Sequence, residues 1–166
     1  MKNIILTLII TLPLTLWGQG WEQTYVEASD IGYGGESVKE TMDGGFISIS
    51  IPWDGPIVRG YVLKTDSYGN EIWSKQTDSN YVYKTVHELT DGYIIGGDKV
   101  WDIGSNTYPF LMKLGPNGSL IWTTTYNPND CHNILKTCLQ TNDGGFILLT
   151  DLCGTIRLIK TDISGS

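Results

Sequence analysis

The sequence predicts an all-β fold, and three observations support this prediction. The 166 residues include 20 Gly, 9 Tyr and 6 Trp, a composition typical of aromatic strands joined by tight turns. Apolar and polar residues alternate with a period of two, as in strands with one buried face. A similar segment occurs three times, at spacings of 48 and 52 residues. Four antiparallel strands per repeat of this length predict a partial β-propeller of about three four-stranded blades; a β-sandwich is the alternative, but it would not explain the repeat.

Residues 1–20 have the pattern of an export signal. Lys2 precedes a 13-residue apolar stretch, interrupted only by Thr and Pro13, that is too short to span a bilayer. Small residues at Gly18 and Gly20 suit signal peptidase, with cleavage before Trp21 or after Gly18. A buried strand is the alternative interpretation. We expect a secreted or cell-surface protein without a transmembrane anchor, and propeller repeats from residue 21 to residue 166.

The first landmark of each repeat is a turn followed by Phe or Tyr. Its residues are Asp43 and Gly44, Asp91 and Gly92, and Asp143 and Gly144. Asp tolerates left-handed backbone dihedrals and Gly adopts them freely, so backbone geometry explains this recurrence without a catalytic role.

The next landmarks lie in the second half of each repeat. They are Lys64, Lys113 and Lys160, then Gly69 and Gly118, each followed four positions later by Trp73 and Trp122. In the second repeat these landmarks predict strands at 83–89, 93–100, 110–114 and 120–126. We expect the recurring Trp, Phe and Tyr side chains to be wedges between blades.

The two ends of the chain match different parts of one repeat. Residues 21–25 resemble residues 122–126, the expected fourth strand of a blade, whereas residues 164–166 align with the turn at 117–119. The repeats therefore cover about 33–77, 81–126 and 131–166, the last lacking the strand that the N-terminus carries. Three blades are too few to close a ring. We expect a fragment of a larger extracellular protein; the alternative is a homodimer in which two chains complete a six-bladed ring.

The segments 43–47 and 63–73 resemble the repeats of large secreted propeller proteins of Bacteroidota, which often carry a type IX secretion sorting domain. This resemblance implies location more than activity. Residues 66–73 also resemble the tryptophan-docking repeat of quinoprotein dehydrogenases, in which Asp, Gly and Trp lock neighbouring blades together. Here the Asp-to-Gly step is one residue shorter, and Gly115 stands where the second repeat should have Asp. Only the docking role is carried over, and no cofactor.

Composition and motifs argue against several function classes. The formal net charge is −7 with 11 Lys and Arg, which leaves no basic stripe for nucleic acid. His87 and His132 occupy different places in their repeats, so no metal site is predicted. We expect His87 to be structural and His132 to be solvated. No nucleophile elbow, zinc-protease motif, phosphate-binding loop or EF-hand loop is present, and we predict no catalytic, cofactor-binding or metal-binding residues.

The recurring lysines have two interpretations. At equal radius around a ring they would line a channel and attract an anion. Alternatively they pair with acidic residues of the turns, and Asp66 and Asp162 lie two positions from Lys64 and Lys160. We favour the structural pairing.

Three cysteines and two tryptophans complete the candidates. Cys138 stands where other repeats have Val38 and Val86, so we expect it to be buried. A disulfide between Cys131 and Cys153, almost symmetrical about the 142–144 turn, is a hypothesis. Trp53 and Trp101, each ten residues after its repeat's turn Asp, are possible aromatic residues of a ligand-binding face, although core packing is the favoured interpretation.

These observations predict a non-catalytic binding or scaffold module whose extracellular ligand is a glycan or a protein. The alternative is a part of a secreted propeller enzyme, a hydrolase or an oxidoreductase, whose catalytic residues lie outside this chain.

Overall fold

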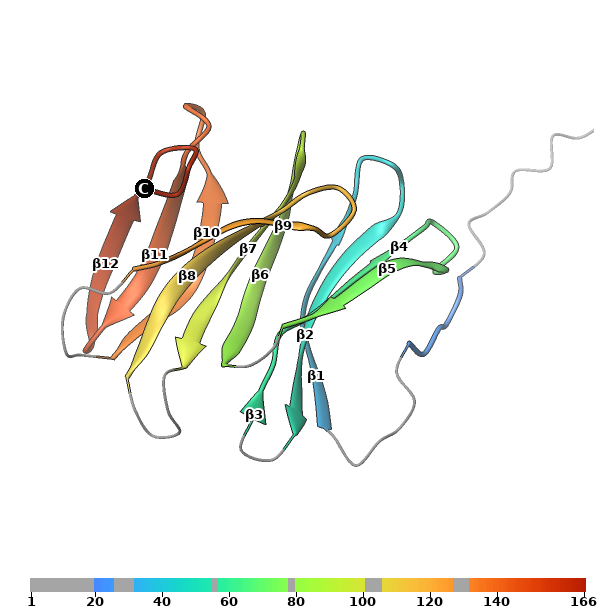
Figure 1. Ribbon diagram of the computed structural model, residues 1–166, viewed down its shortest axis with the longest axis horizontal. Coiled ribbons are helices and arrows are strands. Elements are labelled where there is room, and N and C mark those ends of the chain that lie inside the picture. The colour runs from blue at the N-terminus through green and yellow to red at the C-terminus, as the bar shows by residue number, and fades with distance from the viewer. Residues whose placement is uncertain (1–19, 26–31, 55–56, 78–79, 101–105, 127–131) are drawn as a thin grey trace, which may run out of the picture.

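The computed structural model describes residues 20–25, 32–54, 57–77, 80–100, 106–126 and 132–166. These residues form three antiparallel sheets that follow one another along the chain and stand side by side (Figure 1). The predicted all-β class is confirmed. The three sheets make an open row, with β12 at one end and residues 20–25 at the other, and the described residues do not close a ring.

The first and second sheets each present four strands in chain order. The first sheet comprises β1 (Gly32–Glu40), β2 (Phe46–Asp54), β4 (Tyr61–Thr65) and β5 (Glu71–Gln76), with the short β3 (Ile57–Val58) paired to β2. The second sheet comprises β6 (Tyr81–Leu89), β7 (Gly92–Val100), β8 (Thr107–Leu114) and β9 (Leu120–Thr125). The four strands expected in the second repeat are therefore present; one end of each strand differs from the prediction by one to three residues, and the other end agrees with it.

The third sheet has three strands among the described residues. They are β10 (Asn133–Gln140), β11 (Phe146–Leu152) and β12 (Thr155–Lys160). In the first two sheets the fourth position is occupied by β5 and by β9. In the third sheet no described strand occupies the equivalent position beside β12.

The first strand of every sheet contains a bulge at the same repeat position. The register shifts between Gly35 and Ser37 in β1, between Tyr83 and Thr85 in β6, and between Leu135 and Thr137 in β10. A bulge bends its strand and turns backbone groups out of the ladder. The repeat thus extends to local backbone irregularities.

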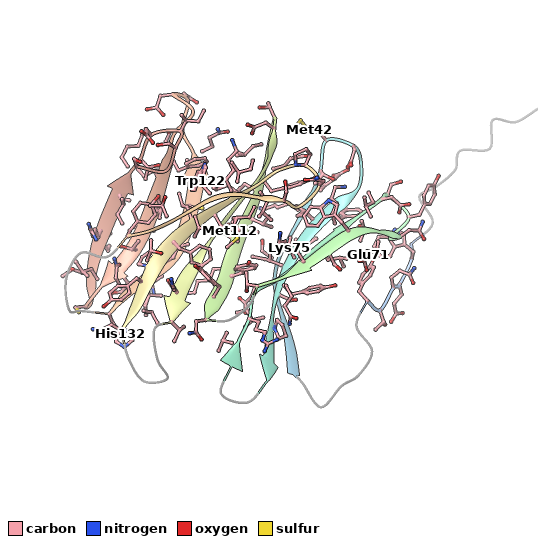
Figure 2. All side chains as sticks on the ribbon, in the orientation of Figure 1. Met42, Glu71, Lys75, Met112, Trp122 and His132 are labelled. Carbon is pink, nitrogen blue, oxygen red and sulfur yellow. The ribbon has the colours of Figure 1, made fainter. Side chains whose placement is uncertain are left out.

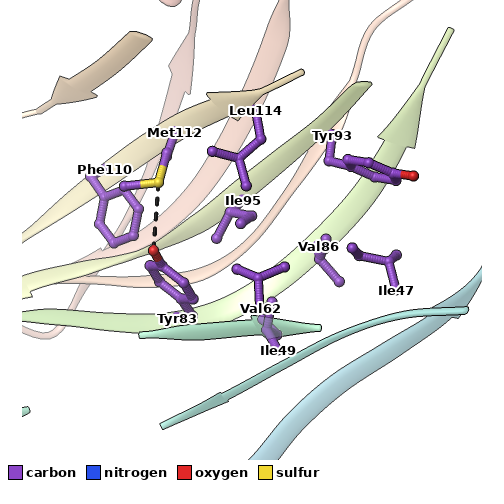
Figure 3. Packing of buried hydrophobic residues seen from close by; sticks show 10 residues of the cluster. All are labelled: Ile47, Ile49, Val62, Tyr83, Val86, Tyr93, Ile95, Phe110, Met112 and Leu114. Atoms are coloured by element: carbon purple, nitrogen blue, oxygen red, sulfur yellow. Dashed lines mark hydrogen bonds between the residues drawn. The ribbon is translucent and has the colours of Figure 1, made fainter. Parts of the chain in front are cut away.

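Two hydrophobic cores fill the spaces between neighbouring sheets. Figure 3 shows the core between the first and second sheets, made of Ile47, Ile49, Val62, Tyr83, Val86, Tyr93, Ile95, Phe110, Met112 and Leu114. The core between the second and third sheets consists of Leu89, Ile94, Leu111, Leu135, Cys138, Phe146 and Leu148. The second sheet contributes to both cores because its side chains alternate between its two faces.

No helix among the described residues is long and apolar enough to cross a membrane.

Candidate functional site

Trp73, from the fourth strand of the first sheet, docks on the second sheet. Its Nε1–H donates to the Pro116 carbonyl oxygen at 3.1 Å, and its ring lies edge-to-face with Tyr93 at 5.8 Å. The ring covers the turn residue Gly118, where an added Cβ atom would lie 2.8 Å from it. Gly118 has a φ of 76°, a left-handed conformation that favours Gly. Both backbone angle and ring contact therefore require glycine there.

Trp21 makes the same contacts with the first sheet. Its Nε1–H donates to the Ser67 carbonyl oxygen at 3.1 Å, its ring covers Gly69, and its ring centroid lies 5.9 Å from that of Phe46. The Tyr25 hydroxyl donates to the Gly69 carbonyl oxygen at 2.9 Å. Residues 21–25, expected to be a fourth strand, form no strand in the structure, because no described strand lies alongside for them to pair with.

Trp122, labelled in Figure 2, repeats the arrangement on the third sheet. Its ring covers Gly165 and lies edge-to-face with Phe146 at 6.1 Å. The Tyr126 hydroxyl donates to the Gly165 carbonyl oxygen at 2.8 Å. For Trp73 and Trp122 this is the geometry expected of wedges between sheets. Trp21 makes the same contacts at the end of the row, where its side chain is 45 % exposed.

The recurring lysines pair with the acid of the first turn in their own sheet. The shortest distances from Nζ to a carboxylate oxygen are 2.9 Å for Lys64 and Asp43, 2.8 Å for Lys113 and Asp91, and 2.7 Å for Lys160 and Asp143. The pairing with Asp66 and Asp162 expected from the sequence is wrong. Those carboxylates instead accept backbone N–H groups of their own turns, from residues 68 and 70 and from residues 164 and 166.

The electrostatics of the turn acids follow from these bonds. Hydrogen bonds from Thr41 and Lys64 hold the pKa of Asp43 far below its ordinary value. The bonds that Lys160 and Thr141 donate do the same to the pKa of Asp143. Lys64 also donates to the Thr65 carbonyl oxygen at 2.8 Å, and its side chain is only 3 % exposed. This ammonium group holds a turn together and is not presented to an anionic ligand.

The two histidines lie apart. His87 is half-buried on β6, with Nε2 3.0 Å from the Thr85 hydroxyl, and burial lowers its pKa. His132 is exposed beside the start of β8 (Figure 2), with Nδ1 3.2 Å from the Thr107 hydroxyl. In the described part of the chain, no three His, Cys, Asp or Glu side chains converge as a metal site would require.

A groove of about 390 Å³ opens between the first and second sheets and is the candidate ligand site. It is lined by Val62, Lys75, Gln76, Thr77, Tyr81, Tyr83, Met112, Leu114, Leu120 and Thr123. Tyr83 and Met112 form part of its floor, where the Tyr83 hydroxyl donates to the Met112 sulfur at 3.5 Å (Figure 3). The Thr123 hydroxyl is buried and has no hydrogen-bond partner among the described residues. Amide, ammonium and hydroxyl groups around an apolar floor suit a neutral polar ligand.

The cysteines differ in state. Cys138 is a free thiol buried between the second and third sheets, and burial raises its pKa to about 12. Cys153 is disulfide-bonded. Cys131 lies outside the described residues, so its pairing with Cys153 stays a prediction.

The two tryptophans expected near a ligand face are not positioned by the structure. The backbone of Trp53 lies in β2, opposite Gly32 and Val58, but its side chain is outside the described part. Trp101 lies outside it altogether. Their placement on a ligand face stays a prediction.

One structural pair is not predicted from the sequence. Lys84 and Asp98 form an ion pair on the second sheet and together clamp Leu135 of the third sheet. Lys84 donates to the Leu135 carbonyl oxygen at 3.0 Å, and Asp98 accepts the Leu135 N–H at 2.7 Å. The sequence contains a signal for this pair, because Lys136 and Asp151 occupy the same two positions one repeat later. They also form an ion pair, at 3.5 Å.

No protein-family model and no curated protein sequence matches this chain.

Proposed function

We propose that the chain is a secreted, non-catalytic binding or scaffold module whose sheets are blades of a β-propeller. The observation that carries the proposal is that the recurring charged and aromatic side chains are engaged in structure. The lysines bind turn carboxylates, and the tryptophans cover glycines of the next sheet. A catalytic site would need acids, bases or metal ligands free to converge on a substrate.

We assign ligand binding to the groove between β5 and β9. Its rim carries the exposed Lys75 and Gln76, and its wall carries the unpartnered Thr123 hydroxyl. An apolar aromatic floor with a few hydrogen-bonding groups is a common way to bind a sugar ring, since ring faces are apolar and hydroxyls lie at their edges. A glycan is therefore the ligand class that this groove fits.

The test is a glycan array probed with the chain purified from culture medium, followed by titration of any ligand found. Gln76→Ala should weaken binding about tenfold, the loss expected for about 1.4 kcal/mol of hydrogen bonding. Glu71→Ala is the matched control, because Glu71 is exposed on the same strand (Figure 2) but does not line the groove. No binding to any glycan, or equal effects of the two variants, would contradict the assignment. Turnover of a glycan or an alcohol would contradict the non-catalytic proposal.

A further inference from the structure

One face of the third sheet exposes apolar side chains at a position that is buried in the second sheet. Leu158 in β12 and Leu111 in β8 are equivalent positions, but Leu158 is 63 % exposed and Leu111 is fully buried against the third sheet. Ile156 and Leu139 of the third sheet are also exposed. Several large apolar side chains exposed on one sheet usually mark an interaction site.

The first sheet presents the opposite half of the same kind of contact. Val38 is 62 % exposed, whereas its equivalents Val86 and Cys138 are buried by the preceding sheet. Beside Val38 lies a groove of about 470 Å³ whose lining includes Tyr25, Ser48 and Leu63. The row of sheets therefore ends in two faces that correspond to the two sides of each internal sheet contact.

Polar groups at these two faces also correspond. On the second sheet, Lys84 and Asp98 clamp the backbone N–H and C=O of Leu135, next to the bulge of β10. On the third sheet, Lys136 and Asp151 form the equivalent pair, half-exposed. Asp151 already accepts the Gly154 N–H, and a carboxylate oxygen accommodates a second donor. On the first sheet the equivalent of Leu135 is Gly35, beside the same bulge.

The strand edges match as well. In the first two sheets the fourth-strand tryptophan lies opposite the recurring lysine, Trp73 opposite Lys64 and Trp122 opposite Lys113. Trp21 already makes the docking contacts of such a tryptophan. The same register would place it opposite Lys160 of β12. Within one chain β12 and residues 20–25 lie at opposite ends of the row (Figure 1).

We propose that the occupant of both faces is a second copy of this chain. The third sheet of one copy packs on the first sheet of the other, and residues 21–25 of each copy complete the third sheet of its partner. A contact between two different faces either closes a ring or extends into a filament. The three sheets formed by the described residues of each copy make six sheets for two copies, which lies within the usual range of blade numbers for a closed propeller. Closure also covers the open edge of β12.

Light scattering of the purified, exported chain over the micromolar range tests this proposal. The expected mass is that of two copies, and Leu158→Glu should reduce it to that of one copy because the charge is placed in the apolar contact. Ile121→Glu is the matched control: Ile121 is similarly exposed on β9 but lies outside both faces, and this variant should keep the dimer. A monomer at every concentration, or a ladder of larger species, would overturn the two-copy ring.

Cysteine cross-linking provides a test that does not depend on a destabilising variant. The register places Gln23 opposite Leu158 of the partner, as Thr124 lies opposite Leu111. The double variant Gln23→Cys, Leu158→Cys should give a covalent dimer under mild oxidation. Gln23→Cys with Arg157→Cys should not, because neighbouring residues in a strand point to opposite faces. Equal cross-linking of both pairs, or none, would contradict the register.

This inference rests on the propeller architecture of the proposed function, but it fails separately from the proposed ligand binding. The groove between β5 and β9 is not part of either end face. Leu158→Glu should therefore abolish dimerisation and leave glycan binding unchanged. Gln76→Ala should weaken glycan binding and leave the dimer intact.

Discussion

The second and third sheets have nearly the same strands and turns, but only the second is covered on both faces. Equivalent leucines in β8 and β12 are fully buried and 63 % exposed, respectively. The lysine side chains that follow them are 10 % exposed at Lys113 and 45 % exposed at Lys160. The comparison shows that burial at a repeat position is set by the neighbouring sheet and not by the residue type, since both strands keep their leucine.

The largest expected difference between these sheets is in the cost of removing that leucine. Leu111→Ala should lower the free energy of unfolding by about 2–5 kcal/mol, because it leaves a cavity in the core beneath the third sheet. Leu158→Ala should change it by less than about 0.5 kcal/mol for the dissociated chain, as expected at an exposed site. Urea unfolding at low protein concentration measures both. Similar losses would mean that the third sheet is covered even in the single chain.

A second comparison separates backbone angle from tryptophan docking. Gly44 and Gly118 have the same left-handed φ, 77° and 76°, but an added Cβ meets nothing at Gly44 and meets the Trp73 ring at Gly118. Gly44→Ala should cost about 1–2 kcal/mol of stability from the backbone alone. Gly118→Ala should cost about 1–3 kcal/mol more, from displacement of the ring.

Urea unfolding followed by tryptophan fluorescence provides both measurements for this pair. The emission of the folded Gly118→Ala chain should also shift to the red, because a displaced Trp73 ring is more exposed to water. An equal cost for both variants, with unchanged emission, would show that docking contributes nothing to stability.

The third comparison is between the ion pairs of the first and third sheets and includes their dependence on pH. Asp43→Asn deprives the buried Lys64 ammonium group of its charged partner, which should cost about 1–3 kcal/mol at neutral pH. Asp143→Asn should cost less, because Lys160 is half-exposed and solvent replaces the partner. The pKa of Asp43 is depressed in the folded chain, so its contribution is present above the ordinary aspartate pKa of about 3.9 and is lost as the pH falls below it.

Urea midpoints at neutral and acid pH test this sign. The gap between wild type and Asp43→Asn should be constant near neutrality and should shrink below about pH 4, where the Asp43 carboxylate of the unfolded wild-type chain becomes protonated while that of the folded chain stays ionised. A gap that persists in acid would mean that the substitution acts through packing instead of charge.

Much of the fold could be predicted because the residues that recur in each repeat are determined by local backbone geometry. Turn glycines recur since left-handed backbone angles favour them, and the four strands of the second repeat follow from alternation between such turns. Trp73 and Trp122 were assignable as wedges because an aromatic residue that recurs at one repeat position has an architectural role more often than a ligand-binding one.

The features that could not be predicted are contacts between residues that are distant in the sequence. The sequence predicts Asp66 as the partner of Lys64 by proximity along the strand, but the actual partner, Asp43, lies in the turn that precedes the neighbouring strand β2. Lys84 and Asp98 of the second sheet bind the backbone of Leu135 in the third sheet. This contact can be recognised only when the relative position of the two sheets is known. The groove between β5 and β9 is likewise made by residues that are not adjacent in the sequence.

The smallest expected effect is chemical and compares the two faces of the third sheet. Cys138 lies on the covered face, and burial raises the pKa of its thiol to about 12, so little thiolate is available to an alkylating agent near neutral pH. A cysteine introduced by Leu158→Cys on the bare face should react rapidly in the dissociated chain and slowly once the protein concentration favours dimers. Mass spectrometry of timed samples would resolve the two thiols.

After unfolding without reductant, wild type should show one reactive thiol, since Cys153 is disulfide-bonded. Three reactive thiols would contradict the pairing of Cys153 with Cys131. Rapid alkylation of native Cys138 would instead show that the contact between the second and third sheets opens readily, which would make the covered and bare faces differ less than their burial indicates.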